Sequence, residues 1–311
     1  MQASFDESTL WPPVEKLPDN FNPKVVLENG KNPGLGIKDL HEQGISGKGT
    51  YVGIIDQKLD THHPEYANNI SHYIEIDSSL SEDSKEEISM HGPGVASLFV
   101  GENCGMAPES PLFYVASPAD RENRSWEDQS KSLKKIIEHN KKSSDKVRIV
   151  SCSFNYPNPA FKGNLNEWLQ TKKRSGENGI IVVDTHMLFK SGFVGGGNPS
   201  ENKNDINGHE KDLSFRDNDP SFLGNKIIIL SDYRTVASSW NKEGIYSYYG
   251  RGGISRAVPY LAGIFSLMLQ VDKNLTKDEI INITKETVLV NSFGLKIINP
   301  KGMIDFVKSK K

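Results

Sequence analysis

Short apolar runs rich in β-branched residues alternate along the chain with longer segments whose apolar residues recur every three or four positions. The first pattern predicts buried strands and the second predicts amphipathic helices. We predict strands at residues 50–55, 112–116, 147–153, 179–184 and 226–230. Helices are expected at 37–42, 126–140 and 165–174, and two more begin near His91 and Ser255. Because strands alternate with helices, we expect a three-layer α/β fold, a mainly parallel sheet with helices on both faces.

Residues 1–33 lie outside this alternation. They hold five prolines among polar residues, namely Pro12, Pro13, Pro18, Pro23 and Pro33. Because proline is disfavoured inside helices, we predict an extended arm and no helix here. The arm is either a disordered leader or a regulatory segment, and residues 34–311 are expected to form one domain.

Two later stretches are polar and are interpreted as loops. Residues 66–90 include the acidic cluster 82–87. Such oxygens can hold structural calcium, but the cluster lacks the alternate-position ligand pattern, so we favour a solvated loop. Residues 195–225 are expected to be a long loop or an insertion between strands.

Composition narrows the function classes. At 311 residues with 36% hydrophobic residues, the chain can bury one large core. Its formal net charge is -3, and no Lys/Arg block is interleaved with aromatic residues, which argues against nucleic acid as a partner.

Membrane and compartment signals are weak. The amino terminus lacks a basic segment followed by an apolar one, so no secretory signal is visible. The longest apolar run, 260–269, is interrupted by Gly263 and Ser266 and is too short to span a bilayer, so we expect no membrane partner. Only Cys104 and Cys152 are present, which favours a cytoplasmic chain with two free thiols over one with a disulfide.

Three polar residues stand at the ends of predicted elements. Asp56 closes a buried strand, which is where α/β proteins build sites. His91 opens a helix of small residues, and Ser255 follows two glycines at the start of an apolar helix. Taken singly, Ser255 reads as a plain helix cap and His91 as a structural histidine. The pair His62 and His63 lacks a third ligand at helical spacing, so we interpret it as turn chemistry rather than a metal site.

Together, Asp56, His91 and Ser255 provide the parts of a nucleophilic acyl-transfer site. Such a site needs a serine oxygen, a base that takes its proton and an anion that orients the base. A serine at the start of a buried helix also lies beside free N–H groups, which stabilise a nearby oxyanion.

The motifs around these residues resemble those of the subtilisin-like serine proteases, the subtilases of peptidase family S8, in their usual chain order. The resemblance covers roughly residues 34–305 and rests on Val52-Gly53-Ile54-Ile55-Asp56 with His63-Pro64, on His91-Gly92-Pro93-Gly94-Val95-Ala96, on Gly105-Met106-Ala107-Pro108, and on Gly253-Ile254-Ser255-Arg256-Ala257-Val258-Pro259. It implies a subtilisin-like peptidase domain, with Ser255 as nucleophile, His91 as general base and Asp56 as the orienting anion.

The resemblance also implies a substrate-binding edge. Residues Ser153, Phe154, Asn155 and Tyr156 are similar in position to the family's Ser-Leu-Gly-Gly edge, which pairs with the substrate backbone as an added strand. Here Asn155 and Tyr156 replace two glycines. Bulkier side chains at that wall predict a narrow specificity.

The chain departs from the family where an oxyanion donor is expected. The family follows its fourth strand with an asparagine, whereas this chain has Leu188 at the nearest aligned place, and leucine cannot donate. Losing one such donor costs roughly 10²–10³ in rate. The candidate donors are the main-chain N–H of Ser255 and the side chains of His186 and Asn198, although Asn198 reads more simply as part of a glycine-rich turn.

Two functions of different class follow from the sequence. One is a divergent, intracellular serine endopeptidase that acts on peptide or protein substrates, requires no cofactor for its chemistry and is restrained by residues 1–33. The other is a pseudoprotease that binds peptides or a partner in the same groove without cutting them. Since all three residues of the triad are present, we favour the enzyme.

Overall fold

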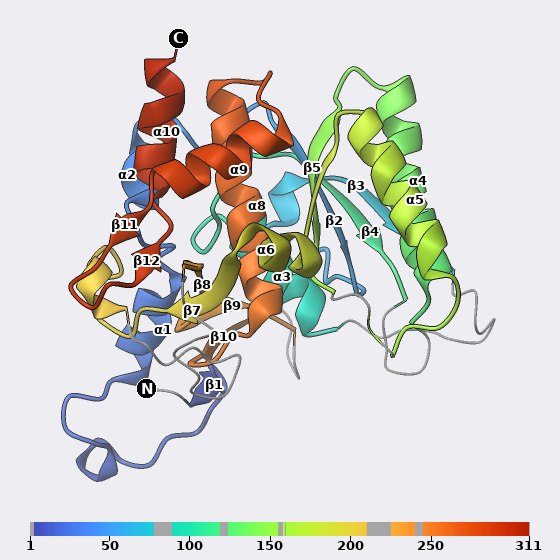
Figure 1. The fold of residues 1–311 in the computed structure, drawn as a ribbon. Helices are drawn as coiled ribbons and strands as arrows, with labels where there is room; N and C mark the ends of the chain where they lie inside the picture. The colour runs from blue at the N-terminus through green and yellow to red at the C-terminus, as the bar shows by residue number, and fades with distance from the viewer. Residues whose placement is uncertain are drawn as a thin grey trace.

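The computed structural model describes residues 3–77, 89–118, 124–154, 158, 160–209, 225–239 and 245–310. Within these residues the chain forms three sheets, of which the five-stranded one is central (Figure 1). Its strands are β2 (Tyr51–Asp56), β3 (Ile70–Glu75), β4 (Leu112–Ala116), β5 (Val147–Cys152) and β6 (Ile181–Asp184). The order is β3-β4-β2-β5-β6, and all neighbours are parallel. Asp56 therefore lies at the carboxyl end of the middle strand.

Helices cover both faces of this sheet (Figure 1). On one face lie α4 (Trp126–Lys142) and α5 (Leu165–Glu177), which enclose a core cluster with Ile55, Val115 and Trp168. On the other lie α3 (His91–Val100) and α8 (Ile254–Val271), which share the larger core with β2. The predicted three-layer α/β fold is confirmed.

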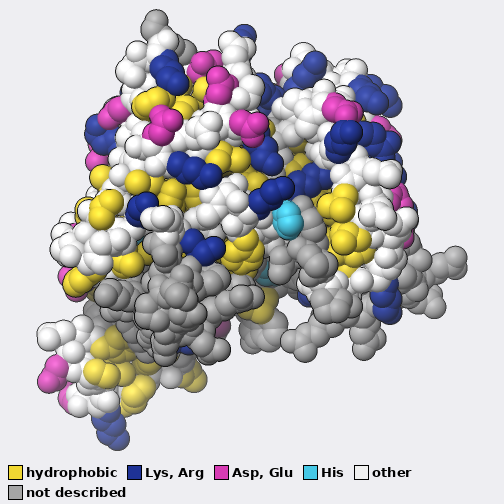
Figure 2. All heavy atoms as spheres, in the orientation of Figure 1, with side chains coloured by type: hydrophobic (Ala, Val, Ile, Leu, Met, Phe, Trp, Pro, Cys, Tyr) yellow, Lys and Arg dark blue, Asp and Glu magenta, His cyan; other side chains and the backbone are white. Residues whose placement is uncertain are grey.

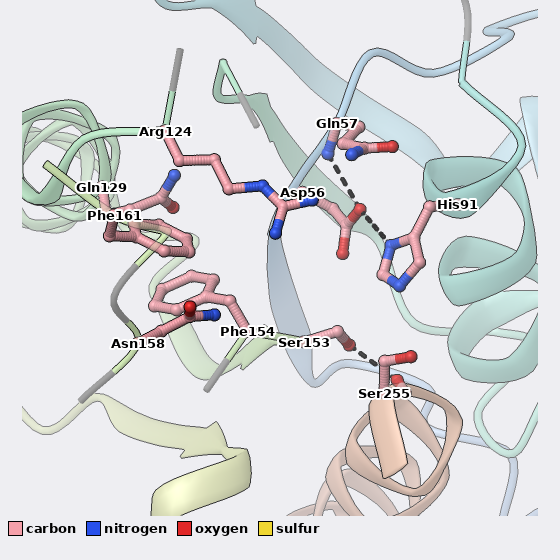
Figure 3. Close-up of a pocket in the computed structure, with 10 residues that line it drawn as sticks. All are labelled: Asp56, Gln57, His91, Arg124, Gln129, Ser153, Phe154, Asn158, Phe161 and Ser255. Atoms are coloured by element: carbon pink, nitrogen blue, oxygen red, sulfur yellow. Dashed lines mark hydrogen bonds and ion pairs between the residues drawn. The ribbon is translucent and has the colours of Figure 1, made fainter. Parts of the chain in front are cut away.

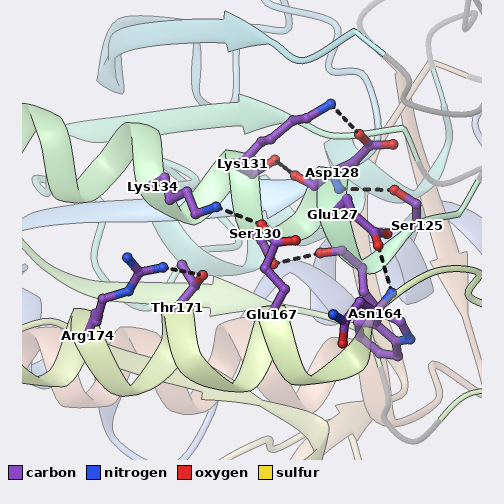
Figure 4. A network of polar contacts seen from close by, with 12 residues as sticks. Ser125, Glu127, Asp128, Ser130, Lys131, Lys134, Asn164, Glu167, Thr171 and Arg174 are labelled. Atoms are coloured by element: carbon purple, nitrogen blue, oxygen red, sulfur yellow. Dashed lines mark hydrogen bonds and ion pairs between the residues drawn. The ribbon is translucent and has the colours of Figure 1, made fainter.

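The pair α4 and α5 is joined by polar contacts along its exposed side. Lys134 Nζ lies 2.7 Å from Glu167 Oε1, and the main-chain N–H of Asn164 donates to Glu127 Oε1 at 2.7 Å (Figure 4). Ser125 caps α4 by accepting from the N–H of Asp128. These contacts fix the amino ends of both helices beside the carboxyl end of the sheet.

Helix α8 is long and apolar enough to cross a membrane by length and composition, and it alone passes that test in the described part of the chain. In the structure 78% of its apolar window is buried inside the protein. It is the central core helix, packed between α3 and the strands β5 and β8.

A second sheet, in the order β11-β12-β8-β7, lies beside the first. It is made of β7 (Phe193–Gly197), β8 (Ile227–Asp232), β11 (Leu289–Val290) and β12 (Lys296–Ile297). The remaining elements of this part of the chain are α2 (Ile37–Glu42), α6 (Thr185–Ser191), which contacts β7, the 3₁₀ turn Ile206–Gly208, α9 (Lys277–Glu286) and α10 (Pro300–Ser309). The prediction that residues 195–225 form one loop is wrong at its start, because Gly195–Gly197 pair with β8.

The stretch 66–90 also differs from expectation, because it contains a 3₁₀ turn, Ala67–Asn69, followed by β3. Only β4 neighbours β3, so the strand is at the edge of the sheet and carries exposed polar residues such as Ser71 and His72. A half-exposed edge strand lacks the continuous apolar run of a central parallel strand. The acidic cluster 82–87 lies outside the described residues.

The amino-terminal arm is packed onto the body of the protein. Its strand β1 (Ser4–Asp6) pairs antiparallel with β10 (Ile245–Tyr249), which in turn pairs with β9 (Arg234–Ser238). Phe5 is the centre of an aromatic cluster with Trp11, Phe21 and Tyr248.

A 3₁₀ turn, Val14–Lys16, and the helix α1 (Pro23–Lys31) complete the arm. The prediction that the arm contains no helix is wrong. Pro23 lies in the first turn of α1, where its missing N–H costs nothing, and Asn22 caps the helix. Buried Arg234 ties α1 to the body, since its Nε donates to the carbonyl of Gly30 and its Nη2 to that of Cys104.

Cys104 and Cys152 are both buried and are not joined to each other. Burial raises the pKa of both thiols well above the ordinary value. Of the two alternatives, the structure has the free thiols, and they are protonated and inert at neutral pH.

Candidate active site

Asp56 and His91 meet at the carboxyl end of β2. Asp56 Oδ1 lies 2.7 Å from His91 Nδ1, and Asp56 is only 7% exposed (Figure 3). The same oxygen accepts the main-chain N–H of Gln57 at 2.8 Å. A carboxylate held in this way fixes the imidazole orientation and leaves Nε2 as its reactive atom.

The start of α3 fits against β2 because residue 92 is glycine. A Cβ at Gly92 would lie 2.6 Å from Tyr114 Oη and 2.7 Å from the carbonyl oxygen of Gln57. The hydroxyl of Ser89 accepts the main-chain N–H of His91 at 2.8 Å. The main chain at His91 is therefore positioned by the close approach of Gly92 on one side and by the hydrogen bond to Ser89 on the other.

Ser255 stands in the first turn of α8, as the sequence predicts. The turn before it needs two glycines: Gly253 has a φ of 74°, and a Cβ at Gly252 would collide with the carbonyl of Ser231. The hydroxyl of Ser153, just after β5, donates to the carbonyl of Ser255 at 2.8 Å. This bond joins the sheet to the start of α8.

All three residues of the predicted triad line one pocket of about 190 Å³. Figure 3 shows the ring of His91 above Ser255, with its free nitrogen on the side of the serine. In the described part of the chain no hydrogen bond joins the Ser255 hydroxyl to the His91 ring. Catalytic hydrogen bonds are often long without substrate and tighten when it binds.

The side-chain candidates for the oxyanion site lie elsewhere. Asn198 is 1% exposed, and its amide donates to the carbonyl of Asp205 at 2.8 Å and to that of Asn202 at 3.4 Å. His186 lines a separate surface pocket with Lys172 and Lys190. The structure does not bring Asn198 or His186 to the predicted triad. Of the three candidate oxyanion donors, the main-chain N–H of Ser255 remains.

The family position for an asparagine is a helix in this chain. Asp184 ends β6 and caps α6 by accepting the main-chain N–H of Met187 at 2.7 Å. Leu188 is fully buried on α6. The hydroxyl of Thr185 donates to the carbonyl of Phe154 at 2.9 Å, so the start of α6 is bonded to the predicted substrate edge.

Of the predicted substrate edge, Ser153 and Phe154 line the pocket, whereas Asn155 and Tyr156 lie outside the described residues. The sequence analysis missed five further lining residues, Gln57, Arg124, Gln129, Asn158 and Phe161. The ring of Phe154 lies 5.6 Å from that of Phe161, and Figure 3 shows Arg124 reaching across the pocket toward the side of Asp56. These residues come from segments that only the fold places together.

Arg256, next to Ser255, packs away from the reacting groups. Its guanidinium lies 3.5 Å from the ring centroid of Tyr249 on β10. Burial lowers the pKa of Arg256 to about 10, so the side chain stays charged at neutral pH. This cation–π contact fixes the start of α8 to the β9–β10 hairpin.

His62 and His63 make contacts typical of turn residues, and the main-chain N–H of His62 donates to Asp60 Oδ1 at 3.0 Å. His63 is buried, its Nδ1 accepts the N–H of Glu65 at 3.1 Å, and its Nε2 donates to the carbonyl of Ile245 at 2.9 Å. Both ring nitrogens are therefore occupied. Among the residues that the structure describes, no group of three or more His, Cys, Asp or Glu could hold a metal ion.

Curated relatives of the chain are proteases. The chain is 25% identical over 290 residues to the subtilisin-like protease PopC of Myxococcus xanthus, covering 84% of this chain and 59% of that protein. It is 27% identical over 181 residues to the major intracellular serine protease of Bacillus subtilis, covering 55% of this chain and 53% of that protein. The chain thus spans little more than half the length of these relatives.

A solved structure and a family model agree with the fold. The structure of the prenylagaramide maturation protease PagA matches with a TM-score of 0.57 at 16% identity, covering 88% of this chain and 98% of that chain. The Peptidase_S8 model, described as the subtilase family, matches residues 47–185, which include Asp56 and His91 and end before Ser255. Over residues 47–185 the chain is therefore similar to the subtilase family of peptidases.

Proposed function

We propose that the chain is a serine endopeptidase that hydrolyses peptide or protein substrates through an acyl-enzyme. The observation that carries the proposal is the 2.7 Å contact between His91 Nδ1 and Asp56 Oδ1 in the pocket that Ser255 also lines. The protease names of the curated relatives support it.

In the proposed first step, Ser255 Oγ attacks the carbonyl carbon of the scissile bond while His91 Nε2 takes the hydroxyl proton. Asp56 stabilises the imidazolium through Nδ1–H. The C–N bond then breaks as the imidazolium gives its proton to the leaving amine, and an ester remains on Ser255. Water repeats the sequence in reverse: it loses a proton to His91, its oxygen attacks the ester, and Ser255 leaves with the proton. Nucleophile, base and anion are all side chains, so these steps need no metal or cofactor.

We propose an oxyanion site of unusual composition. The main-chain N–H of Ser255, in the first turn of α8, is one donor, and the helix amino terminus adds its favourable dipole. Because the amide of Asn198 is committed to its own loop and Leu188 cannot donate, neither of these described residues supplies the usual side-chain donor. We expect turnover to be roughly 10²–10³ slower than that of a subtilase with a full set of donors.

Narrow specificity is the second part of the proposal. The rings of Phe154 and Phe161 provide an apolar surface in the pocket, and Arg124 adds a positive charge at its wall. A short pocket with both features discriminates among side chains more strongly than an open apolar cleft. The protein is expected to act in the cytoplasm, which suits two buried free thiols.

A fluorophosphonate probe tests the nucleophile directly. The probe should label the wild-type chain on Ser255, and Ser255→Ala should abolish labelling while leaving the thermal unfolding midpoint unchanged. Ser144→Ala, at an exposed loop serine, is the matched control and should label like wild type. A folded wild-type chain that the probe does not label would instead support a peptide-binding pseudoprotease.

A further inference from the structure

A second pocket, of about 720 Å³, lies at the meeting point of α5, α6 and α9. It is lined by Leu169, Lys172, His186, Met187, Lys190, Ser191, Lys277, Asp278, Ile281, Asn282 and Lys285. None of these residues lines the triad pocket. Its size falls within the range of pockets that bind ligands.

The charged side chains around this pocket are mostly positive. Four of its lining residues are lysines and one is an aspartate. The ammonium of Lys172 is neutralised by buried Asp184 beneath the pocket. By contrast, Lys190, Lys277 and Lys285 have no carboxylate partner among the described residues. Figure 2 shows Lys and Arg side chains gathered over the part of this face where α5, α6 and α9 meet.

The lysines of this cluster repel one another, and the charges of Asp184 and Asp278 offset part of that repulsion at Lys277. Burial, together with the nearby positive charge of Lys172, lowers the pKa of Lys277. The chain as a whole carries a net charge of -3, so a local excess of lysine is not a consequence of overall composition. Three separate helices contribute the lysines, and the fold rather than one helix face brings them together.

The lining also has an apolar part. Leu169 is 39% exposed, and Met187 and Ile281 line the pocket beside it. An aliphatic patch ringed by lysines suits a chain that alternates carboxylates with aliphatic side chains. Among the described lining residues there is no Phe, Tyr or Trp ring for a nucleobase to stack on and no arginine fork for bidentate phosphate binding.

From this combination we propose that the pocket between α5, α6 and α9 binds an acidic polypeptide segment of a protein partner, with Leu169 and Ile281 contacting its aliphatic residues. The positive rim would be engaged by Asp and Glu side chains at Lys190, Lys277 and Lys285. The inference concerns binding and holds whether or not the triad is active.

The pocket is also mechanically close to the catalytic site. His186 lines it, and the preceding residue, Thr185, donates to the carbonyl of Phe154 in the triad pocket. A partner seated on α6 therefore contacts the element whose start is bonded to the predicted substrate edge.

Binding is best measured with the full-length Ser255→Ala chain, which cannot cleave the probe. The probe is a rhodamine-labelled twelve-residue peptide of repeated Glu-Glu-Leu, followed by fluorescence anisotropy at fixed ionic strength. We expect saturable binding, and at least tenfold weaker binding of the matching Gln-Gln-Leu peptide, because the carboxylates supply the complementary charge.

Two triple charge-reversal variants, one in the pocket and one elsewhere on the surface, locate the binding site. Lys190→Glu/Lys277→Glu/Lys285→Glu should weaken binding at least tenfold. The control is Lys141→Glu/Lys142→Glu/Lys146→Glu, which reverses three lysines of another surface pocket that has only polar lining, and it should change binding less than twofold. Thermal unfolding of both variants confirms that each is folded.

Four results would overturn the proposal: no saturable binding, equal binding of the neutral peptide, equal losses in the two triple variants, or displacement by inorganic phosphate at constant ionic strength. The last would mark a small-anion site instead. Because the assay uses a chain without its nucleophile, a failure here leaves the fluorophosphonate test of catalysis unaffected.

Discussion

The hydroxyl of Ser153 donates to the main-chain carbonyl of Ser255 at 2.8 Å, so the residue that follows β5 of the central sheet holds the first turn of α8 in place. Asp56 lies at the end of an adjacent strand of the same sheet. The proposed nucleophile and its orienting anion are thus positioned from one edge, and His91 is brought to that edge by α3.

Removing this bond should affect both stability and reactivity. In Ser153→Ala the carbonyl of Ser255 loses its partner, which should lower the free energy of unfolding by about 1 kcal/mol. Because the start of α8 is then less fixed, the fluorophosphonate labelling rate should fall several-fold. Urea unfolding and labelling kinetics measure the two effects, and a labelling rate equal to that of wild type would show that the bond does not position Ser255.

Helix α3 offers a matched pair of glycines. A Cβ at Gly92 would meet Tyr114 Oη at 2.6 Å, whereas at Gly94 the nearest atom is Val236 Cγ2 at 3.4 Å. Gly92→Ala should therefore destabilise the chain by about 2 kcal/mol and displace His91, with loss of labelling. Gly94→Ala should be neutral, or stabilising by about 0.5 kcal/mol, because alanine favours the helix. Equal unfolding midpoints for the two variants would contradict the close approach at Gly92.

The amino-terminal arm is expected to be part of the folded structure. Phe5 packs against Trp11, Phe21 and Tyr248, so Phe5→Ala should cost about 3 kcal/mol of unfolding free energy. Leu10, which is 96% exposed, is the control, and Leu10→Ala should change the unfolding free energy by less than about 0.5 kcal/mol. If Phe5→Ala unfolds like wild type but labels faster, the arm is a regulatory segment rather than a structural one.

His209 predicts a stability change at mildly acidic pH. It is 1% exposed, neither ring nitrogen has a hydrogen-bond partner among the residues that the structure describes, and burial followed by the charge of Lys203 lowers its pKa to about 4. The unfolded chain takes up this proton at the ordinary pKa of 6.5, so unfolding is favoured as the pH falls from about 6.5 to about 4. The loss should reach about 3 kcal/mol below pH 4.

The variant His209→Phe removes the proton-binding group. Urea unfolding at several pH values should show a shallower decline between pH 6.5 and 4 than in wild type. Identical slopes for the two chains would mean that His209 is not held neutral in the folded state.

The sequence predicted the central strands well because they are buried and continuous. β4 has the predicted bounds, since Leu112–Ala116 are hydrophobic and buried throughout. The edge strand β3 is not apparent from the sequence because half of its residues are polar. An edge strand pairs with only one neighbouring strand, so it does not need a continuous apolar run. The helix α1 is not apparent from the sequence because proline usually ends a helix, whereas Pro23 stands at the first helical position, where proline is tolerated.

The residues of the candidate site also divide into those that the sequence predicts and those that it does not. The three triad positions carry local signals, a strand end and two helix starts, and the structure places them in one pocket. The oxyanion candidates carried no such signal. The side chain of Asn198 is held in its loop by a hydrogen bond to Asp205, which the sequence does not reveal. Arg124 and Gln129 line the pocket from a segment that has no motif of its own.

The most direct test of the triad as one working unit is the kcat/KM of Ser255→Ala, His91→Ala and the double variant, on a peptide substrate that the wild type cleaves. Residues that act together are not additive, so each single variant and the double variant should lose the same factor, at least 10³. If the losses multiply in the double variant, or if His91→Ala retains wild-type kcat/KM, Asp56, His91 and Ser255 do not form the proposed catalytic unit.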